Sequence, residues 1–333
     1  MTSATAGITV ADVERAAARI AGLVDPSPVI RSPRLSDQLG VDVWLKLECL
    51  QPPGSFKVRG AASKMLALSP GEREHGVIAC SGGNHGAAVA YVAQRLGVPA
   101  TICVPETVDP VKLRAIQGSG AEAVVEGATY DDAVEVSERL QRERGLSYVH
   151  PFDDPEVIAG QGTIGLELLE QVPGLAAVVG GVSGGGLIGG LGAALKGRAP
   201  AVRVIGASAA NAAAMVASLK AGHPVDVPYQ DTLAEVLAGG IGLDNHWSFA
   251  AVRDFVDEHV LVNEADIAAA MVFALSVHRV VAEGGGCAAL AAALSGKLPA
   301  LDGPLAIVVS GGNVDPRVVL DLASRAGGAS SGG

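Results

Sequence analysis

The sequence has few basic residues for its length, which limits the partners that it can bind. Its 333 residues include 24 Lys and Arg against 35 Asp and Glu, a formal net charge of −11. Such a negative field disfavours non-specific binding to nucleic acids and to anionic membranes. It leaves room for a local phosphate pocket. We therefore expect a small-molecule partner, with no nucleic acid and no membrane.

Paired cysteines, a signal peptide and a membrane span are also missing. Met1–Ala4 are not followed by a basic segment and an apolar run, so no signal peptide is expected. Residues 176–195 carry no charge, but eight of them are glycine, which favours a strand, a loop and a helix over a membrane span. Scattered cysteines without a CxxC pair indicate reduced core residues of a cytoplasmic protein. The four cysteines are Cys49, Cys80, Cys103 and Cys287.

Apolar runs rich in valine and isoleucine alternate with alanine-rich helical stretches, such as 87–96, 131–144 and 264–281. This alternation predicts an α/β fold with parallel-rich sheets flanked by helices. Nine expected strands are many for one sheet, so we predict two lobes with a cleft between them. The expected strands are Val43–Leu47, Val77–Cys80, Thr101–Val104, Ala123–Val125, Tyr148–His150, Ala177–Val179, Val202–Ile205, His259–Val262 and Ala306–Val309.

The first motif that carries chemistry is Gln51-Pro-Pro-Gly-Ser-Phe-Lys-Val-Arg-Gly60. Its prolines and glycine predict a rigid turn, and Ser55 is expected to cap a helix that runs on through Ala61 and Met65. Lys57 then lies in the first helical turn, where the helix dipole and nearby cations disfavour the charged ammonium. A neutral amine is what an imine-forming lysine needs. The alternative is an ordinary solvated lysine.

The second motif is Ser81-Gly-Gly-Asn-His-Gly86, which follows an expected strand and opens a helix. It brings backbone N–H groups, a hydroxyl, an amide and an imidazole to the carboxyl end of a strand, where α/β proteins bind ligands. Such N–H groups suit a carboxylate. The alternative is a tight turn made of turn-forming residues.

The third motif, Gly180-Gly-Val-Ser-Gly-Gly-Gly-Leu187, also lies between a strand and a helix and favours a phosphate. Its GxGxxG match raises a dinucleotide alternative. That alternative requires an acid about twenty residues further on, and Val204–Ser208 contains none. No Lys followed by Ser or Thr is present, so a P-loop is excluded. A phosphate without a nucleotide is the remaining interpretation.

The fourth motif, Val308-Val-Ser-Gly-Gly-Asn313, is a strand that ends in a small hydroxyl, and alone it equally fits a plain strand-to-turn transition. Together the four motifs resemble the fold-type II (tryptophan-synthase-like) pyridoxal-phosphate enzymes, specifically the serine/threonine dehydratase branch. The resemblance runs from about residue 10 to 325. Ser55–Ala61 looks like the signature of that branch, and His150–Pro155 and Val157–Gly165 are close to its usual sequences.

The resemblance implies pyridoxal 5'-phosphate bound in the cleft between a large domain, residues 1–67 and 153–325, and a small substrate-loop domain, residues 68–152. Residues 326–333 have no apolar anchor and are expected to be disordered. The implied catalytic residues are Lys57, Ser81 and His85. The implied cofactor contacts are Lys57, Phe56 beneath the ring, Asn84 at the ring hydroxyl, Glu283 nearby, Ser310 at the pyridine nitrogen, and Ser183, Gly184, Gly185, Gly186 and Leu187 around the phosphate. The implied contacts of the substrate carboxylate are Ser81, Asn84 and His85.

The implied reaction is β-elimination, which converts L-threonine or L-serine to a 2-keto acid and ammonia. A neutral Ser310 favours elimination, because it does not hold the pyridine nitrogen protonated as an aspartate can. Serine racemases carry a serine where this chain has Gly82, so little racemase activity is expected. Metal-dependent relatives carry a Glu and an Asp where this chain has Ser208 and Ala214. Without these hard oxygen ligands we expect no metal and no divalent-metal dependence.

Two stretches, Gly239–Asn245 and Glu283–Gly286, resemble dehydratases assigned to hydroxyectoine breakdown. A larger or more polar β-hydroxy amino acid is therefore the alternative substrate. A nicotinamide dehydrogenase would need an acid near Ser208, and a non-catalytic sensor would show damage at Lys57 or in the loop 81–85. The resembling family commonly forms dimers, so we expect a cytoplasmic homodimer.

Overall fold

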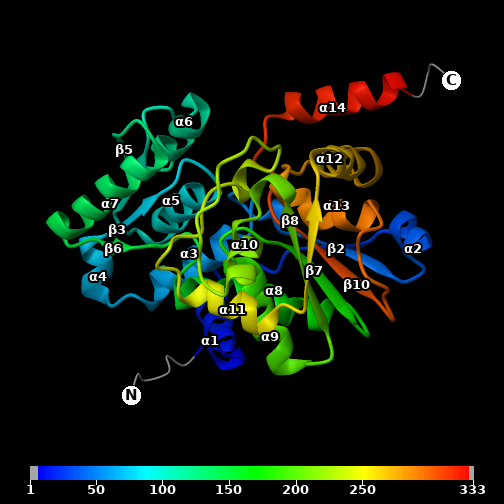
Figure 1. Cartoon of the computed structure of the whole chain (residues 1–333). Coiled ribbons are helices and arrows are strands. Elements are labelled where there is room, and N and C mark those ends of the chain that lie inside the picture. Colours follow the sequence, from blue (N-terminus) through cyan, green and yellow to red (C-terminus); the bar gives the residue numbers. More distant parts are fainter. Residues whose placement is uncertain (1–6, 330–333) are drawn as a thin grey trace.

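The computed structural model describes residues 7–329, which form two lobes, each built around its own sheet (Figure 1). The larger sheet has the strand order β1-β2-β10-β7-β8-β9, and the smaller has the order β5-β4-β3-β6. Neighbouring strands run parallel except for the antiparallel pair β1 and β2. The predicted α/β fold with parallel-rich sheets is confirmed.

All nine expected strands are present, with ends that differ by a few residues. Strand β1, three residues long at the edge of the larger sheet, was not among the expected strands. The strands are β1 Val29–Arg31, β2 Val43–Leu47, β3 Val77–Cys80, β4 Ala100–Val104, β5 Glu122–Val125, β6 Ser147–Tyr148, β7 Ala177–Gly181, β8 Arg203–Ala209, β9 Glu258–Val262 and β10 Leu305–Val309.

Helices cover both faces of the larger sheet. In β10, Leu305, Ile307 and Val309 pack on one face and Ala306 and Val308 on the other, as the two-residue period of a strand requires. On the Leu305 face lie α2 Pro33–Leu39, α12 Glu264–His278, α13 Ala288–Leu294 and α14 Pro316–Ala329. On the Ala306 face lie α8 Pro155–Gln171, α9 Gly186–Arg198, α10 Ala214–Ala221 and α11 Trp247–Phe255.

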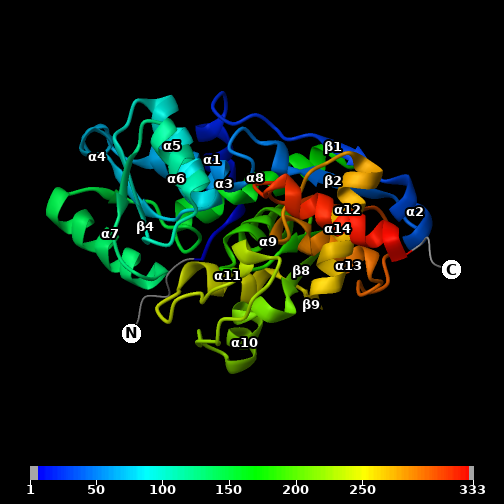
Figure 2. The same cartoon turned by 90° about the horizontal axis from the view of Figure 1, so that it is seen from above.

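The smaller sheet is covered in the same way (Figure 2). Ile102 and Val104 of β4 pack beneath α5 and α6, whereas Ile78 and Cys80 of β3 pack beneath α7. These helices are α5 Asn84–Leu96, α6 Pro110–Gly118 and α7 Tyr130–Arg144, and α4 Pro70–His75 precedes β3.

One helix, α3 Lys57–Ala67, is shared by the two lobes. Its Val58, Ala61 and Met65 belong to the core of the small lobe. On another side, Gly60 fits so closely against α8 that a Cβ there would lie 2.4 Å from Gln161 Nε2. α1 Val10–Ile20 packs beside it. Because α3 contributes to both lobes, the domain ranges 1–67, 153–325 and 68–152 stay a prediction.

The C-terminal segment departs from the expectation. Helix α14 continues to Ala329, so the first four of the residues 326–333 are helical and not disordered, and residues 330–333 lie outside the described part. The charge-free run 176–195 divides into β7, a loop and α9, as expected. Among residues 7–329, no helix is both long enough and apolar enough to cross a membrane.

Candidate active site

The four motifs meet where strands of both sheets end. β3, β7 and β10 lead directly into the second, third and fourth motifs, and β2 leads through a 3-10 turn, Glu48–Leu50, toward Lys57. The first and fourth motifs are joined by a backbone hydrogen bond from Phe56 N to Ser310 O of 3.1 Å. Asn84 Nδ2 of the second motif donates to Glu283 Oε1 at 2.6 Å. Segments far apart in the sequence thus form one site.

Lys57 is the first residue of α3 and therefore lies in the first helical turn, as the sequence predicted. Its amine donates to Pro151 O at 2.6 Å and lies 5.2 Å from the centroid of the Phe56 ring. Burial lowers the pKa of Lys57 to about 8. The predicted direction is therefore right, but the cause is desolvation and not the helix dipole. Near physiological pH the ammonium still predominates, but the neutral fraction is far larger than that of a solvated lysine.

The expected cap at Ser55 is wrong. The residue before the helix is Phe56, and no side chain caps the first turn. Ser55 instead forms an isolated backbone bridge with Gly311, and its buried Oγ has no hydrogen-bond partner among the described residues. The two prolines and Gly54 place Ser55 against the fourth motif, one residue too early to act as the cap.

Helix α5 begins at Asn84, and its first bond runs from Ala87 N to Gly83 O at 3.0 Å. The N–H groups before it have no acceptor within the helix, which suits an anion. His85 Nε2 lies 2.7 Å from Val149 O and must donate to it, which leaves the buried Nδ1 as an unpartnered acceptor. Burial, and then the charge of Lys57, lower the pKa of His85 to about 3. In this arrangement the His85 ring does not donate to a carboxylate, and the N–H groups of the helix start, with the hydroxyl of Ser81, are the candidate donors.

The third motif forms a cradle of backbone N–H groups. Gly185 has φ +89° and precedes α9, whose bond from Gly189 N to Gly185 O leaves the earlier N–H groups without an acceptor in the helix. A Cβ on Gly184 would lie 2.3 Å from the Phe152 ring, so only glycine fits there. The Ser183 hydroxyl donates to Leu237 O at 3.1 Å, and the Leu187 side chain is buried in the core. Ser183 and Leu187 can therefore contribute their backbone N–H groups, as Gly184, Gly185 and Gly186 can.

Two further predicted residues lie at this edge. Ser310 ends β10, is 6% exposed, and its Oγ makes no hydrogen bond to residues 7–329. Glu283 is also buried, and burial raises the pKa of its carboxyl to about 7, although the hydrogen bond from Asn84 opposes the rise. Ser310 thus offers an uncommitted hydroxyl, and Glu283 holds the Asn84 amide.

The segment His150–Asp154 resembles the family's usual sequence, and in the structure its residues make contacts that were not predicted. Pro151 O accepts from Lys57, and the Phe152 ring covers Gly184. Asp153 accepts from the backbone N–H groups at the start of α11, and Asp154 caps α8. The roles of Pro151, Phe152 and Asp153 depend on a carbonyl, on ring packing and on a helix start elsewhere in the chain, so the local sequence carried no signal for them. The cap at Asp154 had a local signal, because Pro155 follows it directly.

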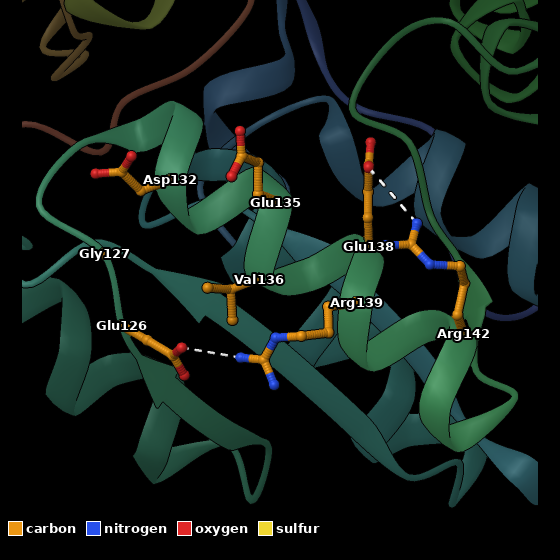
Figure 3. Close-up of a pocket in the computed structure, with 8 residues that line it drawn as sticks. All are labelled: Glu126, Gly127, Asp132, Glu135, Val136, Glu138, Arg139 and Arg142. Carbon is orange, nitrogen blue, oxygen red and sulfur yellow. Dashed lines mark hydrogen bonds and ion pairs between the residues drawn. The ribbon is translucent and has the colours of Figure 1, made fainter.

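A hollow on the surface of the small lobe lies apart from this site (Figure 3). It is formed by α7 and the residues after β5, and ion pairs join Arg139 to Glu126 at 2.8 Å and Arg142 to Glu138 at 3.8 Å. Its other lining residues are Gly127, Asp132, Glu135 and Val136. None of the predicted site residues lines it, and its charged groups are already paired or solvated.

The site can be compared with known proteins. The model of the family described as "Pyridoxal-phosphate dependent enzyme" matches residues 20–311. The chain belongs to this family. The site offers the cofactor of this family a lysine with a lowered pKa, a cradle of backbone N–H groups and the free hydroxyl of Ser310. That Lys57, Asn84 and residues 183–187 hold it stays a prediction.

Several members of the family resemble this pyridoxal-phosphate dependent enzyme over nearly its whole length. An L-threonine ammonia-lyase of Thermotoga maritima is 43% identical over 312 residues, which cover 94% of this chain and 77% of that protein. The solved structure of maize serine racemase has a TM-score of 0.90 at 33% identity and covers 98% of this chain and 100% of its own. The processed form of threonine deaminase isoform 2 from Solanum lycopersicum has a TM-score of 0.87 at 35% identity, with 96% and 87% covered.

The two positions that match the metal ligands of metal-dependent relatives are apolar or committed in this chain. Ser208 is buried and donates to Val182 O at 3.3 Å, and Ala214 is a buried residue at the start of α10. Residues 7–329 contain no group of three or more His, Cys, Asp or Glu side chains placed to hold a metal ion. Independence from divalent metals stays a prediction.

Proposed function

We propose that the protein is an ammonia-lyase that converts L-threonine or L-serine to a 2-keto acid and ammonia. The chain belongs to the family of pyridoxal-phosphate dependent enzymes, and relatives that match most of its length are named threonine ammonia-lyase and threonine deaminase. The observation that carries the proposal is the Lys57 amine, with its lowered pKa, at the same edge as two anion-binding helix starts. One start suits a phosphate and the other a substrate carboxylate.

Each group of the site has its own role in the proposed reaction. When bound, pyridoxal phosphate supplies an electron sink for the negative charge that develops at the substrate Cα. Lys57, as a neutral amine, accepts the Cα proton, and Pro151 O then holds the ammonium that forms. Burial makes this ammonium a stronger acid than that of an ordinary lysine, so Lys57 can release the proton again, and the β-hydroxyl, once protonated, leaves as water. The N–H groups at the start of α5 and the Ser81 hydroxyl orient the substrate by its carboxylate.

The site favours elimination over racemisation. Gly82 supplies no acid on the second face of the substrate, and a Cβ there would lie 3.0 Å from Val108 Cγ2. Reprotonation of Cα from that face therefore lacks a donor. Ser310 is a neutral partner for the pyridine nitrogen and weakens the electron sink, which favours prompt loss of the β-hydroxyl.

The assembly and location belong to the same proposal. Leu50 and Val281 are apolar side chains that are 57% and 40% exposed. Apolar side chains that become covered in an interface favour association with a second copy. We infer a cytoplasmic homodimer, in keeping with its four buried free cysteines.

The proposal is tested by the absorbance spectrum of the purified protein, followed by separate additions of L-threonine and L-serine and a keto-acid assay. A cofactor band that moves with either amino acid, with keto acid released, supports the proposal. The variant Lys57→Ala should lose both signals, whereas Lys220→Ala, at an exposed lysine, should keep them. A cofactor band that shifts with neither amino acid contradicts the proposed substrates, L-threonine and L-serine. No band after cofactor is added contradicts the whole proposal.

A further inference from the structure

Asn313 binds the amide of Asn84 from the opposite lobe. Asn313 Nδ2 donates one hydrogen to Asn84 Oδ1 at 2.7 Å and the other to Pro53 O at 2.8 Å. Asn84 Nδ2 in turn donates to Glu283 Oε1 at 2.6 Å. Asn84 belongs to the small lobe, whereas Asn313 and Glu283 belong to the large lobe. These hydrogen bonds therefore tie the two lobes together at the site.

The orientation of both amides is fixed by their surroundings. Gly54 has φ +78°, and a Cβ there would lie 2.1 Å from Asn313 Oδ1, so the backbone at Gly54 makes room for this side chain. Because both hydrogens of Asn313 Nδ2 have acceptors, its nitrogen must face Asn84. A flipped Asn84 amide would place Oδ1 against the Glu283 carboxylate and its NH2 against the Asn313 donor. The contact with the Asn313 donor would be repulsive in either protonation state of Glu283, and the contact with Glu283 would be repulsive when its carboxyl is ionised, so one orientation is favoured.

We propose that Asn313 is a positioning residue whose amide, together with Glu283, clasps Asn84 in the one orientation that leaves its second N–H for the cofactor. The proposal rests on the proposed role of Asn84 toward the cofactor. One hydrogen of Asn84 Nδ2 is used by Glu283, and its Oδ1 is used by Asn313. The second hydrogen is the only remaining donor of this side chain, and the clasp fixes its direction.

Asn313 suits mutagenesis because it lies at the surface, whereas Asn84 and Glu283 are buried. Asn313→Ala removes the donor, and Asn313→Asp keeps the shape but cannot donate when ionised. The cofactor is removed from the holoenzyme and titrated back, with absorbance as the readout. Loss of one hydrogen bond should weaken cofactor binding about threefold to tenfold in both variants. Asn263→Asp is the matched control, since aspartate caps α12 as well as asparagine does.

A double-mutant cycle separates positioning from a general structural effect. If Asn313 acts through Asn84, Asn313→Ala weakens cofactor binding in the native chain and has no further effect in the Asn84→Ala background. An equal effect in both backgrounds overturns the clasp, because Asn313 would then act by another route. Unchanged binding and an unchanged band in Asn313→Ala also overturn it. If Asn84→Ala itself leaves cofactor binding unchanged, the proposed role of Asn84 fails first and the clasp fails with it.

Discussion

Replacing Arg59 by methionine should destabilise the folded protein by about 3–5 kcal/mol, because it breaks a closed group of buried charges. Arg59 is 1% exposed and donates to Glu48 through Nε and Nη2, both at 2.8 Å. Its remaining donors reach Glu167 and Thr163 Oγ1. Lys46 completes the group with bonds to Glu167, Gln171 Oε1 and Ser27 O.

The size of the stability loss follows from the uncompensated buried charge that the substitution leaves. In the native protein the cations of Lys46 and Arg59 balance the carboxylates of Glu48 and Glu167. Arg59→Met therefore leaves one negative charge in excess. Glu48 is 0% exposed and would keep only the Ser27 hydroxyl, at 2.5 Å, as a hydrogen-bond donor. An uncompensated buried charge of this kind accounts for the range of about 3–5 kcal/mol. Arg59→Met with Glu48→Gln removes one charge of each sign and should recover part of the loss.

The loss should also depend on pH. Burial raises the pKa of Glu48, but in the native protein Arg59, Ser27 and Lys46 outweigh burial and hold it below its usual value. In Arg59→Met burial dominates, so the folded-state pKa rises above the unfolded one. The folded variant then binds the extra proton, and its stability falls as pH increases through that raised pKa. The loss should therefore be smaller near pH 5 than near pH 8.

Urea unfolding followed by the fluorescence of Trp44 and Trp247 measures the change. The control is Arg139→Met, at a guanidinium 44% exposed and paired with Glu126, which should cost about 0–1 kcal/mol. If Arg59→Met costs no more than this control, or its loss does not shrink toward low pH, the buried group does not stabilise the fold in the way described.

Two further predictions concern the cofactor. Cofactor-free protein should capture pyridoxal phosphate at Lys57 at a rate that rises with pH around a midpoint near 8, since only the neutral amine reacts. Stopped-flow absorbance measures this rate. A midpoint typical of a solvated lysine would contradict the lowering of the pKa of Lys57 by burial. Gly184→Ala should weaken cofactor binding by at least about tenfold, the effect of about 1.4 kcal/mol, because a Cβ there would lie 2.3 Å from the Phe152 ring. In Gly118→Ala the added Cβ meets nothing within 4 Å, and this variant should bind the cofactor normally, as measured by the same absorbance titration.

The sequence predicted the parts of the fold that follow from local patterns. Apolar runs bounded by turn residues identified nine strands, and the glycine-rich stretches identified the loops that follow β3 and β7. Strand β1 was missed because three residues, Val29–Arg31, are too few for an alternation to be recognised, and it pairs only at the sheet edge. Ser55 was misassigned because a cap depends on backbone geometry, which composition does not determine.

The site was predictable where a residue's role follows from its type and local position, and unpredictable where the role depends on contacts with distant segments. The amine of Lys57 and the N–H groups after Gly181 follow from residue types and position. The contact of Asn313 with Asn84 joins residues 229 positions apart, and it requires that Gly54, beside Asn313, has no side chain. The desolvation of Lys57 likewise comes from segments that only the folded chain brings around it.

The segment His150–Asp154 limits how this enzyme can be altered by insertion or deletion. Pro151 contacts Lys57, Phe152 covers Gly184, and Asp153 and Asp154 bind the starts of α11 and α8. Four neighbouring residues thus have four separate partners, fixed in order along the chain. Adding or removing one residue would shift every partner by one position at once. Single substitutions here remove one contact, whereas a change of length would displace the lysine, the phosphate loop and two helices together.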